Sequence, residues 1–189
     1  AEPVRSVTLY CAVLKRENFE WVIQKCTEIG VSTIVPIITA RTVKTGLKME
    51  RLRIIAKEAA EQSGRGIIPI IDNPLEFDRA LEEAKNQDNI FFHTLSNEQT
   101  SKPANKQTPV GIWIGPEGGW TEEEVRTAME HGCTVQSLGN LTLRAETAAV
   151  KRISAPSLRA FSTSARAKGP KISGCPAVAS PTQDPRAMR

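Results

Sequence analysis

The sequence has few of the residues that bind metals, and it has no long apolar run. It contains only two histidines, His93 and His131, and four cysteines that form no C-x-x-C pair, so no metal site is expected. Scattered cysteines of this kind are typical of a reduced, cytoplasmic protein. No stretch approaches the roughly 20 apolar residues that a membrane-spanning helix needs. The first residues show no secretory signal pattern and no initiator methionine, as expected of a fragment or a processed form.

The positive charge of the chain is confined to its C-terminal end. The net charge is +4, but residues 151–189 hold eight basic residues and one acid, so residues 1–150 carry a net charge of −3. The basic character therefore gives no evidence that the folded part contacts nucleic acid. The same C-terminal segment is rich in proline and serine and has little apolar surface to offset its ordering entropy. We expect a folded domain over residues 1–152 and a disordered basic tail over 153–189.

Short apolar segments alternate with amphipathic ones along the folded part. Apolar residues recur with a helical period from Phe19 to Ile29, and Gly30 follows in the position of a C-terminal cap. By the same reasoning, helices are expected at 48–63, 74–85, 121–132 and from about 145, with the helical pattern ending after Val150. Strands are expected at 6–14, 31–38, 67–71, 89–95, 110–114 and 134–138. This alternation indicates an α/β domain with a largely parallel sheet.

The most informative segment is I-W-I-G-P-E-G-G-W-T-E-E-E, from Ile112 to Glu124. An apolar strand ends at Gly115, and two further glycines precede a helix capped by Thr121 and Glu124. Glycine permits a positive φ and lets a ligand approach the bare main chain. The spacing matches neither a dinucleotide fingerprint nor a P-loop. The segment predicts a loop that binds a small molecule, and the alternative is an ordinary tight turn.

A second loop of the same kind follows the next predicted strand. It reads S-L-G-N-L-T-L-R-A-E-T-A over residues 137–148 and leads into the last predicted helix. Loops that follow neighbouring parallel strands meet at one edge of the sheet. The two segments are therefore expected to converge on one pocket.

In this order, the two motifs resemble those of the knotted SPOUT methyltransferases. More specifically, they are similar to the family that methylates N3 of a uridine in small-subunit (16S) ribosomal RNA. Two upstream segments also resemble that family, namely Q-K-C-T-E-I-G-V-S-T-I-V-P at 24–36 and E-A-A-E-Q-S-G-R at 58–65. The resemblance implies a SPOUT-type parallel sheet flanked by helices, with a C-terminal trefoil knot. It also implies that the protein acts on ribosomal RNA as a homodimer, with its active site at or near the subunit interface.

The resemblance further implies that S-adenosylmethionine is held by three loops. The expected cofactor-binding residues are Thr94, Leu95, Gly115, Pro116, Glu117, Gly118, Gly119, Leu138, Gly139, Leu143 and Thr147.

The chemistry of methyl transfer to a uracil nitrogen indicates two catalytic candidates. The nitrogen has to lose its proton, and the charge that spreads onto the carbonyl oxygens has to be stabilised. Glu146 is a candidate base and Arg144 a candidate for charge stabilisation. The alternatives are that Arg144 pairs with a nearby acid and that Glu146 is a first-turn acid favoured by the helix dipole. Gln62 and Arg65 are candidates for contacting RNA, with a helix-capping charge as the alternative.

The sequence departs from the family in two places. The N-terminal RNA-binding β-barrel of such enzymes is largely missing, because only the strand-like residues 6–14 precede the catalytic segment. The long apolar helix that normally follows E-T-A is replaced by K-R-I-S-A-P after Val150. These departures leave two other functions open. The chain could be a non-catalytic RNA-binding or ribosome-assembly protein that retains the fold, or an inactive truncated product.

Overall fold

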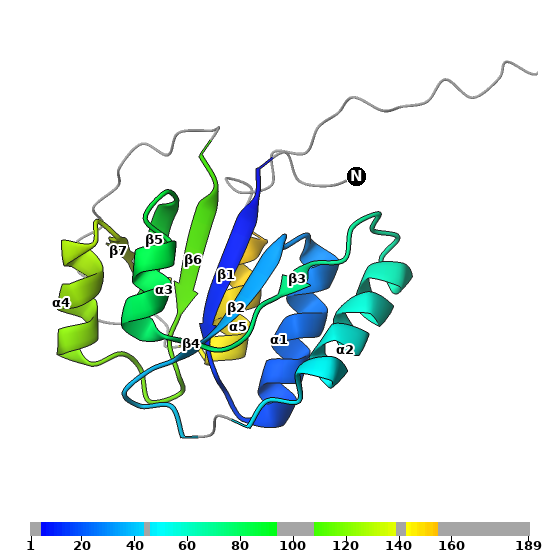
Figure 1. Ribbon diagram of the computed structural model, residues 1–189, viewed down its shortest axis with the longest axis horizontal. Helices are drawn as coiled ribbons and strands as arrows, with labels where there is room; N and C mark the ends of the chain where they lie inside the picture. The colour runs from blue at the N-terminus through cyan, green and yellow to red at the C-terminus, as the bar shows by residue number, and fades with distance from the viewer. Residues whose placement is uncertain (1–4, 44–45, 94–107, 139–142, 155–189) are drawn as a thin grey trace, which may run out of the picture.

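The computed structural model describes residues 5–43, 46–93, 108–138 and 143–154. They form one sheet in which every strand pair is parallel, flanked by helices on both faces (Figure 1). The strands are β1 (Val7–Ala12), β2 (Thr33–Ile38), β3 (Ile70–Ile71), β4 (Leu75–Glu76), β5 (Asp88–Phe92), β6 (Val110–Ile114) and β7 (Thr134–Gln136). The helices are α1 (Arg16–Ile29), α2 (Met49–Gln62), α3 (Phe77–Glu83), α4 (Glu122–Glu130) and α5 (Ala145–Ile153). The predicted parallel α/β architecture is confirmed.

The strand order places the two predicted ligand loops close together. Neighbours in the sheet run β3-β2-β1-β6-β5-β7, and β4 pairs separately with β2. Because all pairs are parallel, the carboxyl ends of β1, β6, β5 and β7 lie at one edge of the sheet. The loops that leave β6 and β7 therefore open beside the start of α1, which follows β1.

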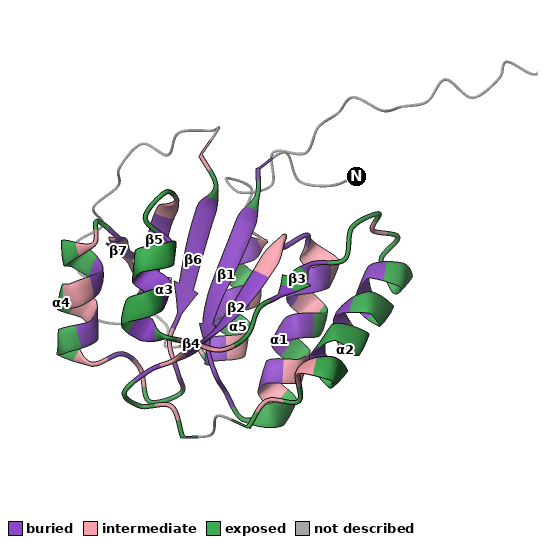
Figure 2. Ribbon diagram, viewed as in Figure 1, coloured by how far each residue is buried: buried purple, intermediate pink, exposed green. Residues whose placement is uncertain are grey.

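Two separate cores hold the helices to the sheet. One contains the inner faces of α1, α2 and α5, and the other contains those of α3 and α4. Along β1, Leu9 and Cys11 belong to the first core, whereas Tyr10 and Ala12 belong to the second, as the period of a strand requires. The central strands β1 and β6 are buried along their length in Figure 2. Burial on both faces explains why these segments read as continuous apolar runs.

The second core contains a polar contact that fixes its largest side chain. Trp113 is fully buried, and its ring stacks on Tyr10 with centroids 4.2 Å apart. Its Nε1–H donates to Asn89 Oδ1 at 3.0 Å, and the Asn89 amide donates to Ala84 O at 2.8 Å. A Cβ added at Gly111 would overlap the Asn89 side-chain oxygen. Glycine at this position leaves room for the amide that satisfies the buried indole.

The bounds of several elements differ from the sequence-based prediction. The strands expected at 67–71 and 134–138 are shorter, as Ile70–Ile71 and Thr134–Gln136. The helix expected from Pro74 begins only at Phe77, because residues 75 and 76 pair with β2 as the short strand β4. The helical pattern expected to end after Val150 continues to Ile153. Ile153 is 3% exposed and packs in the first core, which supplies the burial that holds this last turn. Residues 155–189, which include most of the predicted tail, lie outside the described residues.

Within the described ranges, no helix is both long and apolar enough to cross a membrane. The same residues contain no group of three or more histidine, cysteine or acidic side chains that could hold a metal ion.

We predict that Gly111→Ala destabilises the fold by about 1–3 kcal/mol, because the added methyl displaces the Asn89 amide from Trp113. Urea denaturation followed by tryptophan fluorescence measures the change. Gly66→Ala is the matched control, since a Cβ there meets nothing within 4 Å. Equal stabilities of the two variants would show that the Asn89 contact does not constrain this strand.

Candidate functional site

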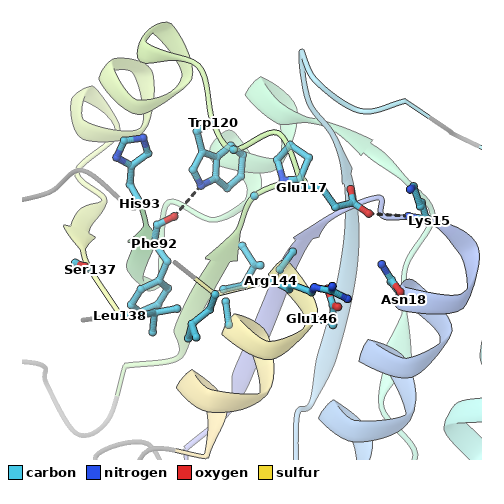
Figure 3. Close-up of a pocket in the computed structure, with 17 residues that line it drawn as sticks. Lys15, Asn18, Phe92, His93, Glu117, Trp120, Ser137, Leu138, Arg144 and Glu146 are labelled. Carbon is cyan, nitrogen blue, oxygen red and sulfur yellow. Dashed lines mark hydrogen bonds between the residues drawn. The ribbon is translucent and has the colours of Figure 1, made fainter. Parts of the chain in front are cut away.

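The carboxyl edge of the sheet carries a cavity of about 530 Å³, within the range of small-molecule sites. It lies between the start of α1, the ends of β5, β6 and β7, and the start of α5 (Figure 3). Its walls are formed by Lys15, Asn18, Phe92, His93, Ile114, Gly115, Pro116, Glu117, Gly119, Trp120, Ser137, Leu138, Leu143, Arg144, Ala145, Glu146 and Ala148.

The loop between β6 and α4 needs glycine at two positions. A Cβ at Gly115 would lie 2.9 Å from the Trp120 indole, closer than real Cβ atoms approach. Gly119 has a φ of +72° and donates its N–H to Pro116 O at 2.8 Å, which closes a tight turn. The Trp120 indole in turn donates to Phe92 O at 2.9 Å. Trp120 therefore lines the cavity and also ties the end of β5 to the loop.

The residues after β2 hold the same loop from outside the cavity. Arg41 Nη1 donates to Gly118 O at 2.6 Å and to Trp120 O at 3.3 Å. Glu124, at the start of α4, accepts the Ala40 N–H at 2.9 Å and forms the predicted capping box with Thr121. These contacts fix the carbonyls of the loop away from the cavity.

A third contact joins this loop to α1. Glu117 Oε1 accepts the main-chain N–H of Lys15, the N-cap residue of α1, at 3.2 Å. In Figure 3 the dashed line between Glu117 and Lys15 marks this bond. The carboxylate satisfies one of the donors that are otherwise unpaired at a helix start. The position of α1 at the cavity thus depends on the G-P-E-G-G loop.

The start of α5 brings both catalytic candidates to the cavity. Arg144 is the N-cap residue and is exposed, and it has no ion-pair partner among the described residues. Glu146 lies in the first turn of α5, where the helix dipole favours an acid, as the alternative to a catalytic role expects. Its Oε2 atom, however, is buried. No hydrogen-bond donor in the described part of the chain reaches that atom. A buried carboxylate oxygen without a donor is costly unless a ligand supplies one.

The buried Cys11 thiol lies near two acidic side chains of the cavity wall. Burial raises its pKa, and the neighbouring charges of Glu117 and Glu146 raise it further. Both carboxylates therefore lie near the end of β1, Glu117 in the loop after β6 and Glu146 in the first turn of α5. The thiol itself stays protonated and unreactive at neutral pH.

The other end of the cavity is less polar. Figure 3 shows Phe92 and Leu138 on the side away from Lys15 and Asn18, with His93 beside them. Burial lowers the pKa of His93, so its ring is neutral at neutral pH. The cavity thus has one end with little charge and one end lined by charged side chains of both signs.

Most of the predicted cofactor residues meet in this cavity. Gly115, Pro116, Glu117, Gly119, Leu138 and Leu143 line it, together with Arg144 and Glu146. Gly118 and Thr147 do not line it, because the Gly118 carbonyl points to Arg41 and Thr147 lies on the exposed side of α5. Thr94, Leu95 and Gly139 lie outside the described residues.

The two RNA-contact candidates lie elsewhere. Gln62 is exposed at the end of α2, and neither it nor Arg65 lines the cavity. Arg65 Nη1 donates to Thr27 O and Val31 O, each at 2.9 Å, at the C-terminal end of α1. This geometry matches the capping alternative for Arg65.

Sequence reasoning expected the cofactor at the strand end that includes Thr94 and Leu95, but it missed the wall supplied by the start of α1 and the individual lining residues at the ends of β5 and β7. Lys15, Asn18, Phe92, His93 and Ser137 all line the cavity. Lys15 precedes the helix as its N-cap, and Asn18 lies in its first turn. A polar residue in a first helical turn is ordinary, so only the pairing of β1 with β6 reveals its place.

We predict that Arg41→Ala loosens the loop without unfolding the domain. The Gly119 amide should exchange with solvent roughly fivefold faster, because a charge-assisted hydrogen bond on an exposed side chain contributes about 1 kcal/mol. Hydrogen–deuterium exchange followed by NMR measures this rate. Arg53→Ala on the exposed face of α2 is the control, and equal exchange in both variants would argue against the Arg41 contact.

Comparison with known proteins identifies the family to which the chain belongs. The family described as "RNA methyltransferase domain" matches residues 1–157. The chain is 38% identical over 157 residues to the ribosomal RNA small subunit methyltransferase E of Mesomycoplasma hyopneumoniae, covering 79% of this chain and 68% of that protein. It is 35% identical over 150 residues to the protein of the same name from Synechocystis sp., covering 75% of this chain and 50% of that protein. The chain thus spans about half to two thirds of the length of these relatives.

Solved structures agree with this placement. The ribosomal RNA small subunit methyltransferase E from Neisseria gonorrhoeae, bound to S-adenosyl methionine, superposes with a TM-score of 0.75 at 29% identity, covering 81% of this chain and 65% of that one. A Legionella pneumophila protein solved in complex with the cofactor SAM gives a TM-score of 0.76 at 34% identity, covering 81% and 66%. The resemblance seen in the sequence motifs is confirmed. The chain belongs to the RNA methyltransferase family that contains the ribosomal RNA small subunit methyltransferases E.

Proposed function

We propose that this protein transfers a methyl group from S-adenosylmethionine to N3 of a uridine in 16S ribosomal RNA. The observation that carries the proposal is the buried, unpartnered Oε2 of Glu146, which lies beside Arg144 at one end of the cavity. The names of the relatives and the cofactor-bound neighbours support the substrate and the cofactor.

The residues present fit S-adenosylmethionine. Phe92, Leu138 and Leu143 offer apolar contacts for an adenosine, and the turn closed by Gly119 exposes main chain to a ligand. The carboxylates of Glu117 and Glu146 favour a cation at the opposite end, where a sulfonium would be held. When bound, the cofactor supplies a methyl group on a sulfonium, whose departure leaves a neutral thioether.

Glu146 and Arg144 divide the remaining chemistry between them. The N3–H proton passes to the Glu146 carboxylate, and the electron pair left on N3 forms the new bond to the methyl carbon. The methyl carbon would come from the bound cofactor, whose sulfonium would leave as the neutral thioether described above. The Arg144 guanidinium stabilises the negative charge that the uracil carbonyl oxygens carry while N3 is deprotonated.

The proposal includes the architecture that the family resemblance implies. We propose a trefoil knot around the second loop, a homodimer with the site near its interface, and a cytoplasmic protein with a basic tail after a domain of about residues 1–152. A dimer is supported by Trp21, which is 40% exposed on α1, one turn beyond the cavity residue Asn18. An apolar side chain of this size at the surface favours a protein contact.

The turn at Gly119 generates a prediction about cofactor binding. Gly119→Ala should weaken S-adenosylmethionine binding about tenfold, or about 1.4 kcal/mol, because a left-handed φ is strained in alanine. Gly118→Ala should change the Kd less than about threefold, since this residue has no positive φ and does not line the cavity. Isothermal titration calorimetry measures both. No binding by the folded parent chain would refute the proposed cofactor.

The role of Glu146 generates a prediction about turnover. Glu146→Gln should lower the rate of tritiated methyl transfer to unmodified small ribosomal subunits by about 10²-fold or more, because the amide cannot accept the N3 proton. Cofactor binding should persist. Glu122→Gln is the matched control, since Glu122 is an exposed acid in the first turn of α4. If both variants lose activity equally, Glu146 is a first-turn acid favoured by the helix dipole and not a base. If the parent chain binds the cofactor but transfers no methyl group, the protein is non-catalytic.

A further inference from the structure

Helix α1 contributes two side chains to the cavity that the proposed chemistry does not use. Lys15 and Asn18 lie three residues apart and therefore share one face at the start of the helix. Helix α1 packs against α5, which carries Glu146. Figure 3 shows Lys15, Asn18 and Glu146 together at the polar end of the cavity, with Arg144 beside them.

The Asn18 amide and the Glu146 carboxylate both line the polar end of the cavity, and neither is used up by a contact within the described protein. Asn18 is half-buried, and its side-chain amide makes no hydrogen bond with any of the described residues. Oε2 of Glu146 is also without a donor in that part of the chain. No hydrogen bond joins the two groups, so both stay available to a ligand. Together they offer one donor beside one acceptor to a ligand that enters the cavity.

Uracil presents the complementary edge. A carbonyl oxygen, which accepts, lies next to N3–H, which donates. Cytosine differs at this edge, because its N3 is an acceptor and its exocyclic amine is a donor. A carboxylate facing N3 and an amide N–H facing the adjacent carbonyl therefore match uracil and mismatch cytosine. Leaving such groups unpaired against the wrong base is costly, so the pair can discriminate strongly.

Lys15 places a cation at the same end. Its main-chain N–H is held by Glu117, which fixes where the side chain begins. The side chain is exposed at the cavity mouth, and its ammonium has no acidic partner among the described residues. A positive charge at this position favours the deprotonated, anionic form of a uracil over the neutral form.

We propose that Asn18 selects uracil as the target base and that Lys15 promotes loss of its N3 proton. Asn18 donates its amide N–H to the carbonyl beside N3 while Glu146 accepts the N3–H. Lys15 acts with Arg144 on the charge that deprotonation leaves on the carbonyl oxygens. The proposal rests on the methyl-transfer function proposed above and extends it to the choice of base.

The first test observes the base contact without any turnover. The side-chain amide signals of the ¹⁵N-labelled full chain are recorded by NMR with S-adenosylhomocysteine present. Uridine 5′-monophosphate should shift the Asn18 signals, which Asn18→Asp identifies by removing them, whereas cytidine 5′-monophosphate should not. Signals that stay unchanged with uridine monophosphate, or that shift equally with both nucleotides, would overturn the selection role.

The second test separates base recognition from cofactor binding. Asn18→Ala should lower kcat/KM for unmodified small ribosomal subunits at least tenfold, while the Kd for S-adenosylmethionine changes less than twofold. Gln24→Ala, an exposed amide on α1 that does not line the cavity, should change neither quantity. A matching loss of cofactor affinity in Asn18→Ala would assign the amide to the cofactor and refute the selection role.

The third test uses pH to detect the role of Lys15. Lys15→Gln should move the rising limb of the kcat–pH profile to higher pH, because the bound uracil loses its N3 proton less readily. Lys15→Arg should restore the profile, and Lys25→Gln should leave it unchanged, since Lys25 pairs with Glu28 on the same helix. A uniform loss of rate with no pH shift would make Lys15 an RNA-anchoring residue instead.

Failure of the base-selection proposal is distinguishable from failure of the proposed function. A parent chain that methylates subunits normally, with Asn18 variants as active and as selective as the parent, refutes base selection alone. A parent chain that shows the uridine-dependent Asn18 shift but neither binds cofactor nor transfers methyl refutes the proposed reaction alone.

Discussion

Gly115 packs against the face of Trp120 at a distance that excludes a Cβ, and the site depends on this contact. Because of this close approach, the chain can leave β6 and turn at Gly119. The Trp120 indole then lies where its N–H donates to Phe92 O at the end of β5. A side chain at position 115 would push the indole away and open the wall of the cavity. The same loop carries Glu117, which accepts the Lys15 N–H and so locates the start of α1. One glycine thus sets the relation between three of the elements that form the site.

The charges of the cavity are arranged locally rather than by the domain as a whole. Residues 1–150 carry a net negative charge, which opposes contact with RNA at long range. At the cavity mouth, however, the exposed Lys15 and Arg144 provide two cations next to the carboxylates of Glu117 and Glu146. The two cations and Glu117 are exposed, whereas the Oε2 atom of Glu146 is buried in the cavity wall.

Local signals in the sequence predicted much of the fold, and their limits have physical causes. The strand Val110–Ile114 and the capping box of Thr121 and Glu124 were predicted correctly, because period, turn residues and caps are properties of short segments. The helix at Pro74 was placed too early, since the pairing of residues 75 and 76 with β2 is a long-range contact. Likewise, the sequence could not separate Gly118 from Gly119, whose roles differ only through the φ angle of the folded turn.

In the candidate site, too, residues within a local motif could be predicted, and residues placed by long-range contacts could not. Arg144 and Glu146 could be identified because they lie within a motif, whereas the wall formed by α1 could not. Asn18 reaches the cavity only because β1 pairs with β6 and α1 packs on α5. Nothing within its own segment distinguishes it from other polar residues at a helix start. Residues that choose a substrate are therefore harder to recognise from one sequence than residues that carry a shared reaction.

The position of Glu146 is secured by the helix that follows it. Ala149 and Ile153 are buried in the first core, one and two turns beyond the carboxylate. Lys151 donates to Leu138 O at 2.9 Å, which ties the helix to the end of the preceding loop segment. Arg152 lies over the Phe92 ring, 5.2 Å from its centroid, on the strand that forms the far wall. Each contact comes from residues after the E-T-A motif, so the short K-R-I segment that departs from the family pattern still holds the proposed base in place.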